Sequence, residues 1–168
     1  MKKIGIVMGS DSDLPVAEKA INTLIEYGVP FEVHVYSAHR TPEEAIAFAK
    51  EARQKDFAAI IALAGKAAHL GGVLAANTTL PVIAVPVKSS LDGMDALLST
   101  VQMPPGIPVA TVGIDAAANA ALLAVELLAI TDEGLAELLT LKRQESKEKV
   151  LEKNRSIEEK FRRSSMQK

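Results

Sequence analysis

The chain has 168 residues, of which 48% are hydrophobic and 24% charged, with no cysteine and a formal net charge of −2. This length predicts one domain with a core of its own, and the hydrophobic fraction excludes a chain that is disordered as a whole. The absence of cysteine excludes a disulfide framework, a thiolate metal site and a thiol nucleophile, while the charge is uneven, with 9 basic and 16 acidic side chains over residues 1–140 and 10 basic and 5 acidic over residues 141–168.

The first half of the chain predicts two strands that alternate with two helices. Lys3–Met8 is a short, mostly apolar run that predicts a strand, and Leu14–Tyr27 carries apolar residues at the spacing of one helix face. Phe31–Tyr36 alternates in the manner of a strand, and His34 falls on its polar face, where we expect a structural role. Residues 41–55 open with Thr-Pro-Glu-Glu, in which the threonine is expected to cap a helix.

The second half of the chain predicts three more strands, each followed by a helix. The first of these strands is almost wholly apolar, as expected for a strand that is buried on both faces. In chain order the segments are the strand Ala58–Ala64, the helix His69–Asn77, the strand Pro81–Val85, the helix Met94–Val101, the strand Val109–Ile114 and the helix Asp115–Ile130. A last helix, rich in lysine and glutamate and capped by Thr131, is expected to reach about Arg163.

Five strands that alternate with helices predict an α/β fold, in which a parallel sheet lies between two layers of helices. We expect the flavodoxin-like doubly wound order 2-1-3-4-5 for a domain of residues 1–130. Residues 131–168 are expected to form a C-terminal helical extension that packs on a neighbouring subunit. Ligands of such sheets bind beyond the carboxyl ends of the strands where the strand order reverses, so the loops after the first three strands are the expected site.

Neither a targeting segment nor a membrane span is predicted. The N-terminal residues lack the apolar stretch and cleavage site of a signal peptide. The longest nearly uncharged helical stretch, Ala116–Ile130, is interrupted by Glu126 and is too short to cross a bilayer, so we expect a cytoplasmic protein without membrane contact. The basic C-terminal segment has one aromatic residue, Phe161, and no nucleic-acid-binding motif, which favours a solvated helix face over a nucleic-acid site.

The first of the three loops is Gly9-Ser10-Asp11-Ser12-Asp13. Its hydroxyls and backbone amides stand before a helix N-terminus, where phosphate binds favourably, and its carboxylates suit sugar hydroxyls or a metal ion. Helix capping alone would also explain serine and aspartate at these positions. The loop lacks the Gly-Lys-Ser/Thr ending of a P-loop and the glycine spacing of a dinucleotide fingerprint.

The second loop, Ser37–Pro42, places His39 beside Arg40, directly after a strand and before a helix. An imidazole can move protons near neutral pH, and a guanidinium offers a planar fork to phosphate. The alternative is an exposed pair of loop residues without a function.

The third loop, Ala64–Gly72, combines glycines, which let the backbone approach a ligand closely, with alanines, which leave a small apolar space. His69 by itself is more typical of capping or packing, and Lys66 fits either phosphate or solvent. Together the three loops indicate an enzyme that acts on a phosphorylated, sugar-containing small molecule by proton transfer, but they do not identify the reaction.

Other classes of protein with this fold fit the loops poorly. A flavin carrier needs aromatic residues that stack on the isoalloxazine, and the three loops contain none. A response-regulator receiver needs an aspartate at the end of the third strand, where this chain has Leu63-Ala64-Gly65. A non-catalytic phosphate-binding module leaves the pair His39-Arg40 unexplained.

Ordered motifs run through about residues 3–130 without obvious gaps. They are Gly9-Ser10-Asp11-Ser12-Asp13, Ser37-Ala38-His39-Arg40-Thr41-Pro42, Ala67-Ala68-His69-Leu70, Leu80-Pro81-Val82-Ile83 with Val85-Pro86-Val87, and Val101-Gln102-Met103-Pro104 followed by Gly106-Ile107-Pro108-Val109-Ala110-Thr111. In this set the chain resembles the N5-carboxyaminoimidazole ribonucleotide mutases of purine biosynthesis, a family also described as the catalytic subunit of phosphoribosylaminoimidazole carboxylase.

The resemblance implies an isomerase that moves the carboxylate of N5-carboxyaminoimidazole ribonucleotide from the exocyclic nitrogen to C4, through trapped CO2 and without a metal or organic cofactor. It implies that His39 is the general acid/base, that Ser10 and Arg40 bind the phosphate, and that Asp13 binds the ribose. The remaining cavity wall that it implies is Ser12, Ser37, Ala38, Ala64, Gly65, His69 and Leu70. A homo-octamer, and a functional link to the ATP-dependent synthase that makes the substrate, are implied as well.

Two positions depart from the family's usual loop, Gly-Gly-Ala-Ala-His-Leu-Pro-Gly. Lys66 stands where the family has a glycine, and Gly71 where it has a proline. A basic residue in that place resembles the animal-type relative that carboxylates aminoimidazole ribonucleotide directly with CO2, so this activity is the alternative. Arg40 and His69 favour the mutase.

Overall fold

The computed structural model describes residues 1–165, with side chains described as far as Arg162. The chain divides into two compact units, Met1–Leu128 and Ala129–Lys168. The elements, with η for short 3₁₀ helices, are β1 (Lys3–Met8), η1 (Asp11–Asp13), α1 (Leu14–Glu26), β2 (Phe31–Val35), α2 (Pro42–Ala52), β3 (Phe57–Gly65), α3 (Leu70–Ala75), β4 (Val82–Val87), η2 (Leu91–Gly93), α4 (Met94–Val101), β5 (Ala110–Thr111), α5 (Ala117–Ala129) and α6 (Glu133–Ser165).

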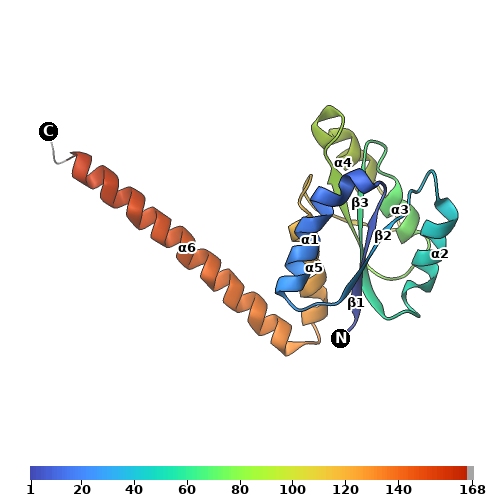
Figure 1. Cartoon of the computed structure of the whole chain (residues 1–168), viewed down its shortest axis with the longest axis horizontal. Coiled ribbons are helices and arrows are strands. Elements are labelled where there is room, and N and C mark those ends of the chain that lie inside the picture. The colour runs from blue at the N-terminus through green and yellow to red at the C-terminus, as the bar shows by residue number, and fades with distance from the viewer. Residues whose placement is uncertain (166–168) are drawn as a thin grey trace. The chain divides into compact units, whose positions relative to one another are not determined.

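The first unit is built on a five-stranded parallel sheet in the order β2-β1-β3-β4-β5, as the sequence predicts. Helices α1 and α5 cover one face of the sheet, and α2 and α3 cover the other (Figure 1). Helix α4 packs against β4 and β5. This is the flavodoxin-like doubly wound arrangement, and it brings the loops after β1, β2 and β3 to one edge of the sheet.

The helices approach the sheet through stripes of alanine. Their fully buried alanines are Ala17 and Ala20 on α1, Ala45, Ala49 and Ala52 on α2, Ala96 on α4, and Ala117, Ala120, Ala121 and Ala124 on α5. A methyl group keeps the helix close to the strands, so the larger side chains of the core come mainly from the sheet. At Gly5 of β1 even a Cβ would lie 2.8 Å from Cζ of Phe48. Close packing of the helices on the sheet therefore accounts for these alanines.

In strand β2 the face with the polar residues packs inward and the face with the valines is exposed, which is the opposite of what its sequence predicts. His34 stacks on Tyr36 with ring centroids 5.2 Å apart, and both rings contact Phe48 of α2. Val33 and Val35, on the other face, are 37% and 49% exposed. The face predicted to be polar thus packs inward, because the ring of Phe48 in α2 covers it, while His34 keeps the structural role expected for it.

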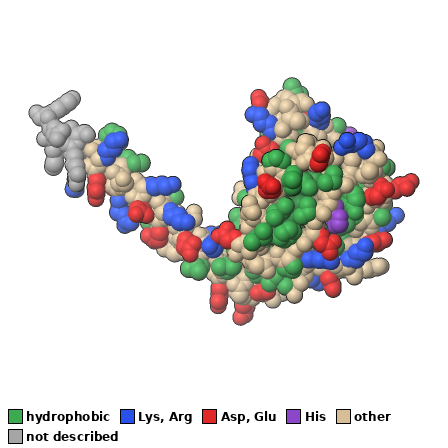
Figure 2. Space-filling model, in the orientation of Figure 1, with side chains coloured by type: hydrophobic (Ala, Val, Ile, Leu, Met, Phe, Trp, Pro, Cys, Tyr) green, Lys and Arg blue, Asp and Glu red, His purple; other side chains and the backbone are tan. Residues whose placement is uncertain are grey.

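An exposed apolar surface accompanies these two valines. Figure 2 shows hydrophobic side chains gathered on the face of the first unit where α1 and β2 lie in Figure 1. In these two elements the exposed large hydrophobic residues are Leu14, Ile25, Val33 and Val35. Contiguous apolar surface of this kind is typical of a protein–protein interface.

Strand β5 is shorter than expected, with two residues in place of the predicted Val109–Ile114. Beyond it the chain keeps two hydrogen bonds to β4, from the amide of Val112 to the carbonyl of Ala84 and from that of Asp115 to Pro86. Asp115 has a positive φ of 56°, which turns the chain out of the extended conformation. The segment therefore follows the sheet edge without continuing the regular ladder.

The helix caps also differ from the expectation. The Thr41 hydroxyl makes no capping bond to α2; its Oγ1 accepts a hydrogen bond from the amide of Ser37 instead, at 2.8 Å. At the start of α6 the capping oxygen is Oδ1 of Asp132, which accepts from the amide of Leu135 at 3.1 Å, and Thr131 lies one residue too early. In both cases the helix begins near the predicted residue, but the threonine hydroxyl does not cap it.

The second unit consists mainly of helix α6, of 33 residues. Leu135 and Leu139 are buried, whereas every residue from Arg143 to Arg162 is exposed. Among the described residues, none of the helices has the length and apolar character that crossing a membrane requires.

Candidate active site

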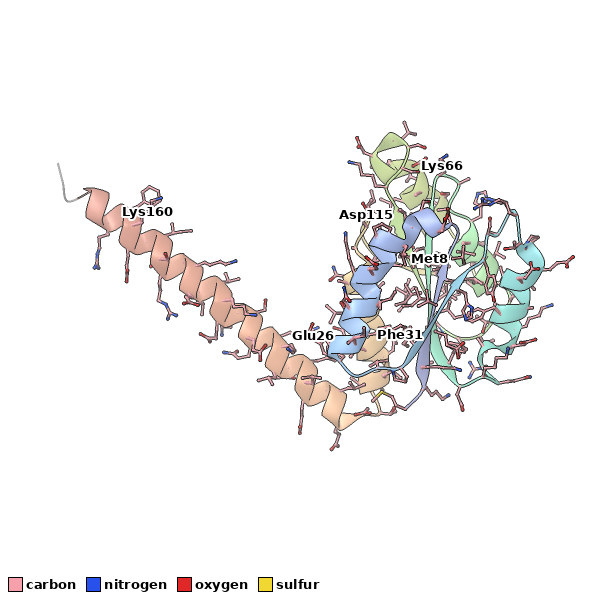
Figure 3. The ribbon with its side chains drawn as sticks, in the orientation of Figure 1. Met8, Glu26, Phe31, Lys66, Asp115 and Lys160 are labelled. Carbon is pink, nitrogen blue, oxygen red and sulfur yellow. The ribbon has the colours of Figure 1, made fainter. Side chains whose placement is uncertain are left out.

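A cavity of about 530 Å³ lies where the loops after β1, β2 and β3 meet. Figure 3 marks this end of the sheet by Met8, the last residue of β1, and by Lys66 just beyond β3, with Phe31 at the start of β2 toward the other end. The cavity is lined by Gly9, Ser10, Ser12, Asp13, Ser37, Ala38, His39, Arg40, Ala64, Gly65, Lys66, Ala67, His69, Leu70 and Ser89. Every residue that the sequence assigns to the site is therefore at this one cavity.

The loop after β1 combines capping with a place in the cavity wall. Oγ of Ser10 accepts a hydrogen bond from the amide of Ser12 at 3.3 Å, and the carboxylate of Asp13 accepts one from the amide of Ser10 at 3.2 Å. These reciprocal bonds form a capping box around the short helix η1. Helix capping and ligand binding by this loop are compatible, because the bonds that cap the short helix also hold the hydroxyls of the loop at the cavity.

Asp13 is the one carboxylate among the cavity-lining residues, and it is only 7% exposed. Burial raises the pKa of Asp13, since it penalises the charged form, and the nearby Asp11 raises it further. The hydrogen bond from the amide of Ser10 and the charge of Arg40 act in the opposite direction. The structure thus keeps a carboxylate in a place where its charge is partly disfavoured.

The loop after β2 is fixed by hydroxyls rather than by its charged residues. Oγ of Ser37 accepts hydrogen bonds from the amides of His39 and Arg40, at 3.3 and 3.2 Å. Nη2 of Arg40 then donates to the carbonyl of Gly9 at 3.0 Å, which ties this loop to the one after β1. The guanidinium therefore stands beside the loop after β1, and its charge next to the hydroxyls of that loop is a combination suited to an anionic group.

His39 and His69 form a hydrogen-bonded pair. Nε2 of His39 lies 2.8 Å from Nδ1 of His69, and the rings meet nearly at right angles, at 86°. One of these two nitrogens must carry the proton and the other must accept it, so the contact links the tautomers of the two rings. Sequence reasoning placed His69 only in the cavity wall; its contact with a residue 30 positions away depends on the sheet order and has no local signal.

The loop after β3 is held by helix α4. Oγ of Ser99 accepts from the amide of Ala68 at 3.1 Å and lies 3.3 Å from the carbonyl of Lys66. Thr100, which is buried, lies with its hydroxyl 3.3 Å from the carbonyl of Ala68. These contacts fix the alanine- and glycine-rich wall from behind, so its small apolar space is defined by backbone.

Ser89, which follows β4, is a cavity residue that sequence reasoning missed. A Cβ at Gly65 would lie 3.1 Å from Oγ of Ser89, so the glycine lets this hydroxyl approach the loop after β3. Its position just past the carboxyl end of β4, next to the switch-point strands, was the available signal. Gly9 and Ala67 also line the cavity through motifs that the sequence had already marked.

No group of three or more histidine, cysteine, aspartate or glutamate side chains suited to a metal ion occurs among the residues that the structure describes. The cavity instead offers one guanidinium, one ammonium, several hydroxyls, one carboxylate and the imidazole pair. This set suits an anionic, hydroxyl-bearing ligand and a proton transfer.

The fold and the cavity define a doubly wound α/β protein with a small-molecule site at the switch point of its sheet. The chain matches the AIR carboxylase family over residues 3–149, and it belongs to this family. The family resemblance inferred from its motifs is thereby confirmed.

Similar proteins cover nearly the whole chain. The N5-carboxyaminoimidazole ribonucleotide mutase of Methanocaldococcus jannaschii is 58% identical over 158 residues, which cover 94% of this chain and 99% of that protein. The protein of the same name from Pyrococcus horikoshii is 55% identical, over 93% of this chain and 89% of that protein. The crystal structure of PurE from Treponema denticola has a TM-score of 0.82 and 32% identity, and the match covers 89% of this chain and 94% of that chain.

Proposed function

We propose that this protein is an N5-carboxyaminoimidazole ribonucleotide mutase of purine biosynthesis. It moves the carboxylate of its substrate from the exocyclic nitrogen to C4 of the imidazole ring and so acts as an isomerase. The observation that carries this proposal is the imidazole pair His39–His69 in a cavity with an anion-binding end and a small apolar wall. The high identity to full-length mutases supports it.

The polar end of the cavity binds the phosphoribosyl group in this proposal. Arg40 and Ser10 bind the phosphate, because the guanidinium of Arg40 and the hydroxyl of Ser10 both line the cavity, and Arg40 reaches the carbonyl of Gly9 next to Ser10. Asp13 accepts hydrogen bonds from the ribose hydroxyls, for which an acceptor-only carboxylate is suited. The substrate is thereby oriented with its base toward His39.

The reaction needs one proton to enter and one to leave. As the bond between the exocyclic nitrogen and the carboxylate breaks, CO2 leaves; C4 of the ring then attacks CO2 and forms the new carbon–carbon bond. The proton on C4 must be removed to restore the aromatic ring, and the exocyclic nitrogen regains a proton. His39 serves both transfers as general acid/base, with His69 accepting from or donating to it across their hydrogen bond.

CO2 must stay in place between the two steps. Ala38, Ala64 and Leu70 give the cavity an apolar portion next to the histidines, and the backbone contacts to α4 keep the loop after β3 in position. Confinement raises the effective concentration of CO2 beside C4, and exclusion of water prevents its hydration. No change of redox state and no net proton release occurs, so the side chains named here suffice for the chemistry.

Direct carboxylation of aminoimidazole ribonucleotide with CO2 is the second candidate, because a cation, Lys66, lines the wall of the cavity. An assay that offers the two substrates separately distinguishes the activities. We expect fast conversion of N5-carboxyaminoimidazole ribonucleotide, and slow conversion of aminoimidazole ribonucleotide that depends on added bicarbonate. The opposite preference would contradict the mutase assignment and support the carboxylase.

The assembly and the cellular setting are part of the proposal. A homo-octamer would cover the exposed apolar residues of α1 and β2 that remain on a single chain. The substrate carries a labile N-carboxylate, so its source is an ATP-dependent carboxylating synthase with which this enzyme is functionally coupled. Both enzymes then work in the cytoplasm.

A further inference from the structure

Two cationic side chains line the cavity: Arg40 in the loop after β2, and Lys66 in the loop after β3. The Lys66 side chain is exposed, and within residues 1–165 no hydrogen bond or ion pair holds its ammonium group. Arg40, by contrast, is anchored to the carbonyl of Gly9 at 3.0 Å. The cavity therefore presents one fixed cation and one that is free to meet a ligand.

The backbone of Lys66 is held in an unfavourable conformation. Its φ is 55°, in the left-handed region that residues with a Cβ rarely occupy. The loop is kept there from α4, because Oγ of Ser99 contacts the carbonyl of Lys66 and accepts from the amide of Ala68. A strained residue whose side chain lines a ligand cavity points to a function for that side chain.

The sheet order sets the separation of the two cations. Arg40 follows β2 and Lys66 follows β3, and β1 lies between these strands. Neighbouring strands are about 4.8 Å apart, so the two loops leave the sheet about 10 Å from each other. Long, flexible side chains can adjust this distance, and the arrangement suits a ligand with two anionic groups at opposite ends.

We propose that Lys66 binds the carboxylate of the ribonucleotide while Arg40 binds its phosphate. This inference rests on the proposed function, in which the substrate and the product each carry both anions. Aminoimidazole ribonucleotide carries the phosphate alone, so of the two cations it meets only Arg40. Lys66 thereby strengthens the binding of carboxylated ribonucleotides relative to aminoimidazole ribonucleotide, and it acts on affinity more than on the chemical step, because the carboxylate is present in substrate and product alike.

The test compares the binding of two ligands to Lys66→Met, Lys66→Arg and the wild type by isothermal titration calorimetry. The ligands are 4-carboxyaminoimidazole ribonucleotide and aminoimidazole ribonucleotide. For Lys66→Met we expect the Kd of the carboxylated ligand to rise about tenfold and that of the other ligand to change less than twofold, as for loss of one charge-assisted contact. Lys66→Arg should restore at least half of the loss on a logarithmic scale.

A folding control separates the side chain from its backbone. Lys66→Gly removes the charge and also relieves the positive φ, so it should melt at a higher temperature than Lys66→Met and show the same loss of carboxylate binding. An equal effect on both ligands, or no effect on either, overturns the role of Lys66. A wild-type protein that binds neither ribonucleotide overturns the proposed function, and the Lys66 assignment with it.

Discussion

At the scale of single residues, the site depends on a few side chains whose partners lie far away in the chain. His39 meets His69 from the loop after β3, and Arg40 meets Gly9 from the loop after β1. The local sequence marks each residue as suited to phosphate or to proton transfer, but the contact gives each its specific orientation. Substitution of one side chain therefore tests chemistry without removing the framework.

Replacement of His39 by asparagine should lower kcat by about 10²–10⁴-fold, since one group serves both proton transfers. The backbone turn around position 39 is held by Ser37, so the Kd for the ribonucleotide should stay within a few-fold of the wild-type value. Initial rates and calorimetric titration measure the two effects. His34→Asn, at the stacked histidine outside the cavity, is the matched control and should keep its activity; activity above a tenth of wild type in His39→Asn would refute the assignment.

The buried carboxyl group of Asp13 should make the protein less stable as pH rises, which is the opposite of the usual effect of a carboxylate. Its pKa is raised above 3.8 in the folded chain, mainly by burial, so the folded state binds this proton more tightly than the unfolded chain. The Asp13 contribution to the free energy of unfolding should then fall as pH rises from about 3.8 through the folded pKa, and stay lower above it.

Asp13→Asn should remove this pH-dependent contribution to stability while keeping an acceptor for the Ser10 amide. Thermal melts of wild type and variant between pH 3.5 and 7 measure the effect, and we expect the variant to gain stability relative to wild type as pH rises. Its affinity for the ribonucleotide should fall, because the ribose loses a charged acceptor. A variant that instead loses stability relative to wild type as pH rises would contradict the burial argument.

At the scale of elements, short-range packing positions the wall of the cavity. Helix α3, which follows the loop after β3, starts with Leu70 and the two glycines Gly71 and Gly72. A Cβ at Gly71 would lie 3.0 Å from Cβ of Ala84 in β4, whereas one at Gly72 would lie 3.3 Å from the end of the Met103 side chain. The two glycines therefore differ in how firmly their surroundings resist a methyl group.

Gly71→Ala and Gly72→Ala form a matched pair. Because Ala84 belongs to a fully buried strand that cannot move aside, Gly71→Ala should lose about 1–2 kcal/mol of the free energy of unfolding and shift α3 away from β4. The flexible end of Met103 can move, so Gly72→Ala should be neutral or gain up to about 1 kcal/mol from helix propensity. Urea unfolding measures both; equal effects would show that contact with β4 does not control α3.

At the scale of the whole molecule, a single copy of the chain exposes surfaces that are suited to contact with another copy. Strand β2 lies at the sheet edge with Val33 and Val35 exposed, and the second half of α6 has no buried residue up to Arg162. The tail has 10 basic and 5 acidic side chains after residue 140, against 9 basic and 16 acidic before it. This opposition of charge favours contact between the tail of one copy and the body of another.

A chain that ends at Leu141 tests this idea, because it keeps the buried residues Leu135 and Leu139 and removes only the basic part of α6. We expect the full chain to sediment as an octamer, and the shortened one to dissociate at a lower protein concentration or melt at a lower temperature. High salt should weaken the full-length assembly in the same direction, since it screens exposed charges. An equally stable octamer after truncation would exclude a role of the tail in assembly.

The amino-acid sequence by itself determined the order of strands and helices, the fold class and most of the residues around the cavity, because hydrophobic periodicity and the carboxyl-end rule are local or topological signals. Only the tertiary structure decided which face of β2 packs inward, where β5 ends, and that His69 meets His39. Those outcomes depend on contacts between segments far apart in the chain, such as α2 covering His34. The contact partner of a polar or small residue cannot be predicted from local sequence, because the strand order of the sheet decides which distant segment lies next to it.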